Sequence, residues 1–319
     1  MNKTGYVRSG DAEKNRTRKG SIMIMPPRKI LIATDLSPRC DRAFDRAVSL
    51  MKEFNSQLIV LHVVESQDGI NSVRRIPFLP VHKPNNLLVD KAKRYLGKSI
   101  NKADINVLVI VEEGNPGETI LRIAREQNCD LIITGVVRKR VFDNFMLGST
   151  IRYLLNKSEK SLLIVNELAG SSYEKILVAS DYTEASRHAV ETAAAFFPER
   201  HMSVLHVYSA PASYAADNPE LFYEQLRPAA TKRFMNFLNA TDLTDQQLDR
   251  MRVIVEWGVL IKLLRDLVNL SGTELVVAGS RNRGLLLNAL FSKHTKRILT
   301  SLTCDILIAR RPFLLNRQI

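Results

Sequence analysis

Four short segments occur twice along this 319-residue chain, in the same order both times. Residues 29–35 read KILIATD, for example, and residues 175–181 read KILVASD. The second copy follows the first by 146 residues in this pair and by 144 residues in the other three. The four pairs are 29–35 with 175–181, 60–63 with 204–207, 130–135 with 274–279, and 162–165 with 306–309. A period the size of a domain indicates a tandem duplication rather than a solenoid of short repeats.

Each half alternates short apolar runs with amphipathic helical patterns. Apolar residues three or four positions apart, such as Ala43, Ala47 and Met51, give a helix one apolar face. Continuous apolar runs are typical of parallel strands that are buried on both faces of a sheet. In the first half, strands are expected at 29–34, 58–64, 105–112, 130–134 and 161–166, with further helices around 87–96 and 120–124. The pattern predicts an α/β fold of two tandem, doubly wound, five-stranded parallel-sheet domains with Rossmann-like architecture.

The domain boundaries follow from the same pattern. A polar, basic segment precedes the first strand, and Gly170, Ser171 and Ser172 interrupt the alternation between the halves. We therefore expect a flexible basic tail at 1–27, a first domain at 28–169 and a second domain at 174–312.

Composition limits the classes of function. The chain has a formal net charge of +13 and three cysteines that form no CxxC pair. Sparse cysteines suit a reducing compartment, and no apolar run approaches the roughly 20 residues of a membrane span, so we expect a cytoplasmic protein without a membrane partner. A basic surface attracts phosphate groups, but no nucleic-acid-binding motif is present and nucleic acid is not an expected partner. The basic runs at 137–141 and 293–297 are expected to be solvated, although the first lies where a ligand could reach it.

Small and hydroxyl residues follow the predicted strands where a ligand would bind. In doubly wound sheets, ligands lie beyond the carboxyl ends of the strands, where the strand order reverses. The first strand runs into Thr34 and Asp35, and the fourth runs into Thr134 and Gly135. A loop is expected next, and then a helix that starts with Gly-Ser-Thr at 148–150. Free N–H groups at such a helix start, together with the helix dipole, favour a bound phosphate.

At these positions the chain resembles a tandem universal stress protein, over roughly 28–167 and 174–311. Family members that bind ATP carry Gly-x-x-Gly, nine residues and then Gly-Ser/Thr; here Gly135 and Arg138 are followed by nine residues and by Gly148. The resemblance implies an adenine nucleotide as the cofactor, with ATP favoured and Mg a possible companion, and no metal-ligand residue is predicted. It places Asp35 near the ribose or phosphates and the backbone of Val63 against adenine. The implied binding residues are Ala33, Thr34, Asp35, Val63, Thr134, Gly135, Arg138, Gly148, Ser149 and Thr150.

Each half departs from the family motif in a different place. Arg138 stands at the second glycine position of the first half, where a left-handed backbone would add strain of about 1 kcal/mol; its side chain could block the pocket or bind a phosphate. The second half has Asn282 there, which tolerates left-handed geometry, but Ser292 and Lys293 replace the glycine and the first hydroxyl of the helix start. We expect an intact first site and a degenerate second one. The possible residues of the second site are Ser180, Asp181, Val207, Gly279, Asn282 and Ser292.

Some of these residues also have structural interpretations. Asp35 and Asp181 could cap the helices that follow them, with or without a ligand. His62 and His206 recur at one strand position without recurring partners. That pattern favours buried, hydrogen-bonded histidines over metal ligands.

The motifs favour a binding protein over a catalyst. No nucleophile–base–orienter set, Walker sequence or HExxH motif is present. The leading hypothesis is a stress-response protein that binds an adenine nucleotide mainly in its first domain and acts as a sensor or regulator. The alternatives are a nucleotide-free interaction or scaffold protein with degenerate sites, and a slow ATP hydrolase. The resemblance implies that the halves pack as a pseudo-dimer, with self-association through the last strands at 161–166 and 304–309.

Overall fold

The computed structural model describes residues 24–36, 38–65, 106–136, 138–141, 144–166, 172–208, 219–280 and 301–311. Of the expected basic tail, only residues 24–27 fall within these ranges, and the helix expected around 87–96 lies outside them. Within these ranges no helix is long and apolar enough to cross a membrane.

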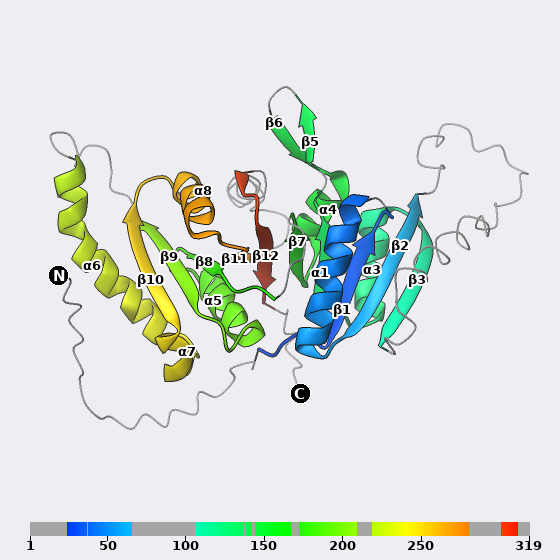
Figure 1. Cartoon of the computed structure of the whole chain (residues 1–319), viewed down its shortest axis with the longest axis horizontal. Coiled ribbons are helices and arrows are strands. Elements are labelled where there is room, and N and C mark those ends of the chain that lie inside the picture. Colours follow the sequence, from blue (N-terminus) through cyan, green and yellow to red (C-terminus); the bar gives the residue numbers. More distant parts are fainter. Residues whose placement is uncertain are drawn as a thin grey trace, which may run out of the picture.

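Both halves alternate strands with helices (Figure 1). The first half contains β1 (Lys29–Thr34), α1 (Pro38–Phe54), β2 (Gln57–Glu65), β3 (Val107–Gly114), α3 (Pro116–Glu126), β4 (Leu131–Gly135), β5 (Arg138–Val141), β6 (Asn144–Leu147), α4 (Ser149–Lys157) and β7 (Ser161–Val165). The second half contains β8 (Ile176–Ser180), α5 (Glu184–Phe196), β9 (Met202–Tyr208), α6 (Pro219–Asn239), α7 (Asp245–Asp249), β10 (Met251–Trp257), α8 (Leu260–Ser271), β11 (Leu275–Ser280) and β12 (Asp305–Arg310).

Ten of these strands form one continuous sheet, in the order β10-β9-β8-β11-β12-β7-β4-β1-β2-β3. Counted outward from the centre, the first half reads β7-β4-β1-β2-β3 and the second reads β12-β11-β8-β9-β10, which is the same order. Neighbouring strands within each half are parallel. The predicted doubly wound α/β fold with two five-stranded halves is confirmed.

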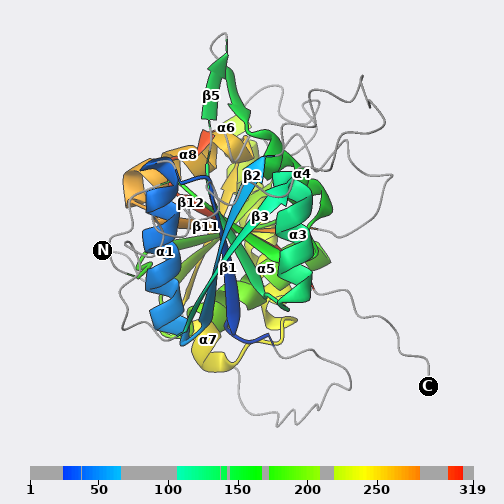
Figure 2. The ribbon, with the colours of Figure 1, turned by 90° about the vertical axis from the view of Figure 1, so that its right-hand side faces the viewer.

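Apolar clusters cover both faces of the sheet. One cluster joins the strands to α1, α5 and α6, and it buries Ala43, Ala47 and Met51, as the helical pattern predicted. The other joins the strands to α3, α4 and α8. Figure 2 shows this layering in the first half, with α1 on one side of the strands and α3 and α4 on the other. Burial on both faces explains why the central strands are continuously apolar.

The halves meet through their last strands. β7 and β12 pair antiparallel, with Leu163 opposite Leu307 at the centre of the register. The prediction that 161–166 and 304–309 join the halves as a pseudo-dimer is confirmed within the chain. Without this pairing each half would end in an apolar edge strand with open hydrogen-bonding groups.

A buried ion pair reinforces this junction on one side. The Asp305 carboxylate accepts hydrogen bonds from Arg46 Nε at 3.1 Å, from the Tyr173 hydroxyl at 2.6 Å and from the Asn166 backbone N–H at 2.8 Å. The Arg46 guanidinium also lies over the Tyr173 ring, 4.0 Å from its centroid. Asp305 is fully buried and Arg46 nearly so. The buried Asp305 carboxylate of the second half is therefore held by donors from the first half and from the segment that connects the halves.

The segment between β4 and α4 differs from the expected loop. β5 and β6 form an antiparallel hairpin in which Arg138 pairs with Leu147, and Figure 1 shows the hairpin projecting from the body of the first half. Sequence analysis missed it because a four-residue strand carries too few residues to establish a period.

Candidate functional site

The first half brings four of the predicted residues to its topological switch point. β1 lies between β4 and β2, and the chain winds outward from it in both directions. Ala33 pairs with Thr134, so the carboxyl ends of β1 and β4 lie side by side. The Thr34 and Thr134 side chains are buried, whereas Asp35 is exposed just beyond β1. This is the part of a doubly wound sheet where ligands bind.

The N-terminus of α4 lies on the α3 and α4 face of this switch point. Leu147 and Ile151, which flank the start of the helix, are buried in the same cluster as Ala33. Gly148 is the N-cap, with φ −56° and ψ 153°, and no side chain caps the helix. Any residue can adopt this φ, so the backbone here does not require a glycine. The first-turn N–H groups, near Ser149 and Thr150, therefore receive no side-chain cap and suit an anion.

Val63 is the residue of β2 that directly follows His62. His62 pairs with Thr34 at the end of β1, and Val63 pairs with Glu112 on β3. Val63 packs at the border of the same apolar cluster as Ala33. The Glu112 carboxylate lies 3.1 Å from the Arg122 guanidinium. The backbone of Val63 thus stands at the same end of the sheet as Asp35.

Arg138 does not carry the strain that its position suggested. It belongs to a strand and pairs with Leu147, so its backbone is extended and not left-handed. A left-handed residue does occur at this site, but it is Leu36, with φ 58°, directly after Asp35. Its N–H donates to Thr34 Oγ1 at 3.0 Å.

The same strained turn recurs in the second half, where Tyr182 has φ 62°. Left-handed geometry disfavours residues with a Cβ, and strain of this kind tends to persist at functional loops. Neither Leu nor Tyr signals it in sequence, because residues that favour this geometry are Gly, Asn and Asp. Sequence analysis therefore missed both positions.

Cys40 is a further residue of the first site that sequence analysis did not assign. It is buried in α1, and its thiol lies against Asp35 and Thr34. Burial raises the pKa of this thiol to about 11, and the neighbouring Asp35 carboxylate adds to the increase. The thiol is therefore protonated at neutral pH and is a poor nucleophile. In the second half the aligned residue is Ser186, which contacts Ser180 Oγ at 3.2 Å.

The two repeated histidines are structural. His62 Nδ1 lies 2.9 Å from the Thr34 carbonyl, and His206 Nδ1 lies 3.0 Å from the Ser180 carbonyl. A carbonyl can only accept, so Nδ1 is the donor in both halves. The prediction of buried, hydrogen-bonded histidines is confirmed for His206, whereas His62 is hydrogen-bonded but only half-buried. Each one ties the second strand of its half to the end of the first.

We expect the buried histidines to make the protein less stable in acid. Burial lowers the pKa of His206 below its ordinary 6.5, and burial does the same for His188. Since the unfolded chain then binds more protons than the folded one, the stabilisation is complete above about pH 6.5 and is lost as the pH falls from there toward the lower folded pKa. Urea unfolding at several pH values between 7.5 and 5.5 should show this decline.

The matched variant is His206→Asn, whose carboxamide can still donate to the Ser180 carbonyl. The free energy of unfolding of this variant should fall less over the same pH range than that of the wild type. Equal slopes for the two proteins would contradict the assignment to His206.

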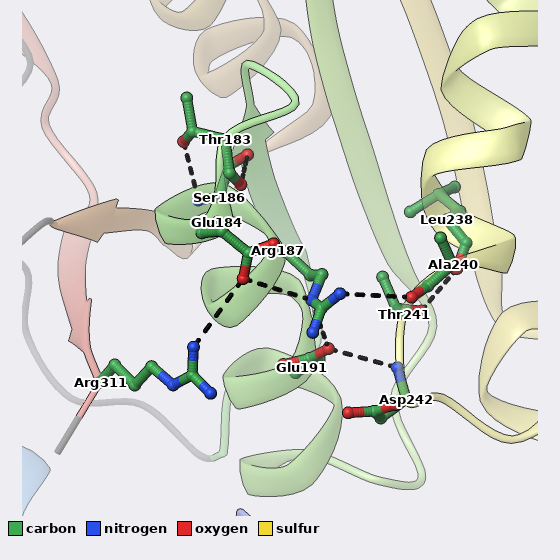
Figure 3. Close-up of polar contacts among 10 residues, drawn as sticks. All are labelled: Thr183, Glu184, Ser186, Arg187, Glu191, Leu238, Ala240, Thr241, Asp242 and Arg311. Carbon is green, nitrogen blue, oxygen red and sulfur yellow. Dashed lines mark hydrogen bonds and ion pairs between the residues drawn. The ribbon is translucent and has the colours of Figure 1, made fainter. Parts of the chain in front are cut away.

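In the second half, the predicted ligand aspartate is engaged in the helix start. Asp181 Oδ1 accepts from the Thr183 N–H at 3.1 Å and from its hydroxyl at 2.6 Å. Thr183, and not Asp181, is the N-cap of α5, and it accepts from the Ser186 N–H (Figure 3). The prediction that Asp181 caps this helix is therefore wrong, because the Asp181 carboxylate instead accepts hydrogen bonds from the cap residue Thr183.

Gly279 has a structural purpose that the sequence did not reveal. A Cβ at this position would lie 1.9 Å from the Ala185 carbonyl oxygen and 2.8 Å from the Ser186 nitrogen. The glycine therefore lets the start of α5 sit directly on the end of β11. Val207 is half-buried at the end of β9, whereas Asn282 and Ser292 lie outside the described residues. No group of three or more His, Cys, Asp or Glu side chains gathers to hold a metal ion in the described parts of the chain.

Known proteins resemble the chain in both halves. A model of the universal stress protein family matches residues 26–166 and again residues 172–310. Universal stress protein YxiE of Bacillus subtilis is 30% identical over 144 residues, covering 43% of this chain and 97% of that protein. Universal stress protein MJ0577 of Methanocaldococcus jannaschii is 25% identical over 152 residues, covering 43% and 94%. Among solved structures, a universal stress protein from Archaeoglobus fulgidus matches at a TM-score of 0.63 and 18% identity, over 89% of this chain and 96% of that one, which shows the fold alone.

Proposed function

The chain belongs to the universal stress protein family, and from this premise we propose that its first half binds an adenine nucleotide, with ATP favoured. The phosphates would lie at the N-terminus of α4, near Gly148, Ser149 and Thr150. The ribose would lie near Asp35, and adenine would lie against the backbone of Val63. The observation that carries the proposal is the N-terminus of α4, which has a glycine N-cap without a side-chain hydrogen bond and follows the carboxyl end of β4, next to β1 in the sheet.

The remaining predicted residues have supporting roles in this proposal. Ala33, Thr34, Thr134 and Gly135 would form the floor of the site, because they end the two central strands. Mg would accompany the phosphates and would be held mainly by them, since the described residues gather no metal-ligand cluster. Arg138, whose backbone pairs with Leu147 in the hairpin, stays among the binding residues that the family motif implies. Binding would serve a sensor or regulator of the stress response, with hydrolysis slow or absent.

A second candidate function is supported for the other half. The Asp181 carboxylate is committed to Thr183, and Gly279 is committed to helix packing. We therefore propose that the second half is nucleotide-free and serves as an interaction or scaffold domain. If neither half binds nucleotide, this candidate describes the whole chain.

The test places a negative charge where the phosphates would sit. Ser149 is exposed in the first turn of α4, so Ser149→Asp should preserve or slightly improve helix stability while repelling a phosphate. By calorimetry with ATP–Mg, ADP and AMP, we expect the wild type to bind and Ser149→Asp to bind ATP at least about tenfold more weakly. A phosphate-release assay on the wild type and on Asp35→Ala measures any hydrolysis.

The matched control is Val259→Asp. Val259 is the exposed N-cap of α8, which also lacks a side-chain cap. This variant adds the same charge to a comparable helix start away from the proposed site, and nucleotide affinity should not change. Absence of binding heat with all three nucleotides in the wild type would overturn the proposal.

A further inference from the structure

The C-terminus of α4 is held by an arginine of the other half. Arg310, the last residue of β12, donates through its terminal guanidinium nitrogens to the carbonyls of Leu155 and Ser158. Leu155 lies in the last turn of α4, and Ser158 is its C-cap. The Arg310 backbone N–H also donates to Ser161 Oγ, at the start of β7, at 3.1 Å. A single residue of the second half thus contacts both the end of α4 and the strand that follows it.

The antiparallel junction explains this reach across the halves. Because β12 runs against β7, the carboxyl end of β12 lies beside the amino end of β7. α4 follows the carboxyl end of β4 and leads into the amino end of β7, so its N-terminus lies toward the sheet edge of the first site and its C-terminus lies at the opposite edge, beside Arg310. Figure 1 shows α4 and β12 on either side of β7.

The chemistry of the contact suits a helix C-terminus. The last carbonyls of a helix have no partner within it, and they carry the negative end of the helix dipole. Arg310 supplies donors and a positive charge to these groups while only 5% exposed. Burial lowers its pKa to about 10, so the guanidinium remains protonated at neutral pH.

We propose that Arg310 is a positioning residue for the phosphate-binding N-terminus of α4, so that the second half sets the ligand affinity of the first. This inference rests on the proposed nucleotide site. α4 has only nine residues, and its buried contacts come from Ile151 and Leu154. A helix this short depends on its ends and on tertiary contacts, because isolated helices of such length are unstable. Loss of the Arg310 contacts at the C-terminus of α4 should therefore disturb the position of its N-terminus as well.

The residue of the first half that aligns with Arg310 is Asn166, and its contact to the other half is of a different kind. Asn166 directly follows β7, whereas Arg310, 144 residues later, is the last residue of β12. Its carboxamide donates to the Cys304 carbonyl at 2.7 Å, so each half reaches the segment that precedes the other's last strand. Only the contact to α4 carries a charge, and α4 is the helix that starts at the proposed site.

The next residue, Arg311, contacts the start of α5 in the second half. Arg311 lies 3.8 Å from Glu184, the first residue of α5 (Figure 3). Glu184 in turn approaches Arg187 on the same helix, also at 3.8 Å. Residues 310 and 311 therefore connect the end of α4 with the start of α5.

The experiment compares ATP with adenosine in Arg310→Met, Arg310→Lys and the wild type. If Arg310 acts through the N-terminus of α4, Arg310→Met should weaken ATP binding about fivefold and leave adenosine binding unchanged. Arg310→Lys, which keeps the charge without the planar fork, should fall between them. Hydrogen exchange of the ligand-free proteins should show the amides of α4 exchanging about tenfold faster in Arg310→Met.

Arg200→Met is the matched control, because Arg200 lies 3.9 Å from Glu53 across the halves without touching α4. It should change neither the exchange of α4 nor ATP affinity. Equal loss of ATP and adenosine, or unchanged exchange and affinity in Arg310→Met, would overturn the inference. A wild type that binds no nucleotide would refute the proposed function instead, while the exchange of α4 would still decide whether Arg310 holds this helix. If Arg310→Met does not fold, Arg310→Lys provides the same comparisons.

Discussion

Replacing Asp305 with asparagine is expected to lower the free energy of unfolding by about 3–5 kcal/mol. The substitution keeps the size of the side chain but removes the charge that faces Arg46 at 3.1 Å. Arg46 would then be a buried cation without its carboxylate, and removal of one partner from a buried pair is strongly destabilising. The amide also replaces an oxygen that accepts from either Tyr173 or the Asn166 N–H. Urea unfolding measures the change.

A double-mutant cycle separates the interaction free energy of the Asp305–Arg46 pair from the effects of each substitution on its other neighbours. Arg46→Met removes the orphaned charge, so Asp305→Asn combined with Arg46→Met should be more stable than Asp305→Asn alone. The control is Glu174→Gln, which removes the exposed acid 3.0 Å from Arg200 and should cost no more than about 1 kcal/mol. An Asp305→Asn protein within 1 kcal/mol of the wild type would show that the junction does not depend on this carboxylate.

The ion pair between Arg46 and Asp305 also affects which halves can associate. The ion pair has no copy on the other side of the pseudo-symmetric junction, because the residues aligned with Arg46 and Asp305 are Thr192 and Ser161. Two second halves placed together would bury two aspartates without arginines. A buried pair of this kind can select one arrangement over others. It therefore favours the pairing of unlike halves that the fold shows.

The second large effect is expected for Gly279→Ala, which should destabilise the protein by about 2–3 kcal/mol. The new Cβ would meet backbone atoms of Ala185 at 1.9 and 2.3 Å. Backbone at a helix start cannot rotate away as a side-chain tip can, so α5 would have to move off β11. Thermal and urea unfolding should both report the loss.

Gly148→Ala is the informative comparison. Gly148 has an ordinary φ of −56°, so an alanine there should change stability by less than about 1 kcal/mol. In the proposed function it would instead crowd the phosphates and weaken ATP binding. A Gly279→Ala protein of full stability would mean that α5 can adjust, and the glycine would then need another explanation.

Much of the architecture was predictable because it depends on local periodicity. The expected strand at 58–64 corresponds to β2 at Gln57–Glu65, and the expected apolar face of the first helix is buried as predicted. The strands that join the halves were also predicted, but from the resemblance to the universal stress protein family, with the covering of open strand edges as an added reason. Only the first of these results follows from patterns that span a few residues.

The candidate site was predictable only in part. The strand ends at Thr34 and Thr134 came from the topology rule, and the start of α4 came from its Gly-Ser-Thr sequence. The left-handed Leu36 and the buried Cys40 were missed, because neither residue type signals its conformation or surroundings. The hairpin was missed because its strands are too short to establish a pattern.

By itself, then, the sequence determined the duplication and the alternation of parallel strands and helices within each half. Each of these depends on hydrophobic period and repetition, which can be read along the chain. Only the tertiary structure decided which contacts secure the junction and the site. Asp305 meets Arg46 across 259 residues, and Arg310 meets Leu155 across 155 residues. A single polar residue gives no sign of such a partner, because the pairing depends on the antiparallel meeting of β7 and β12.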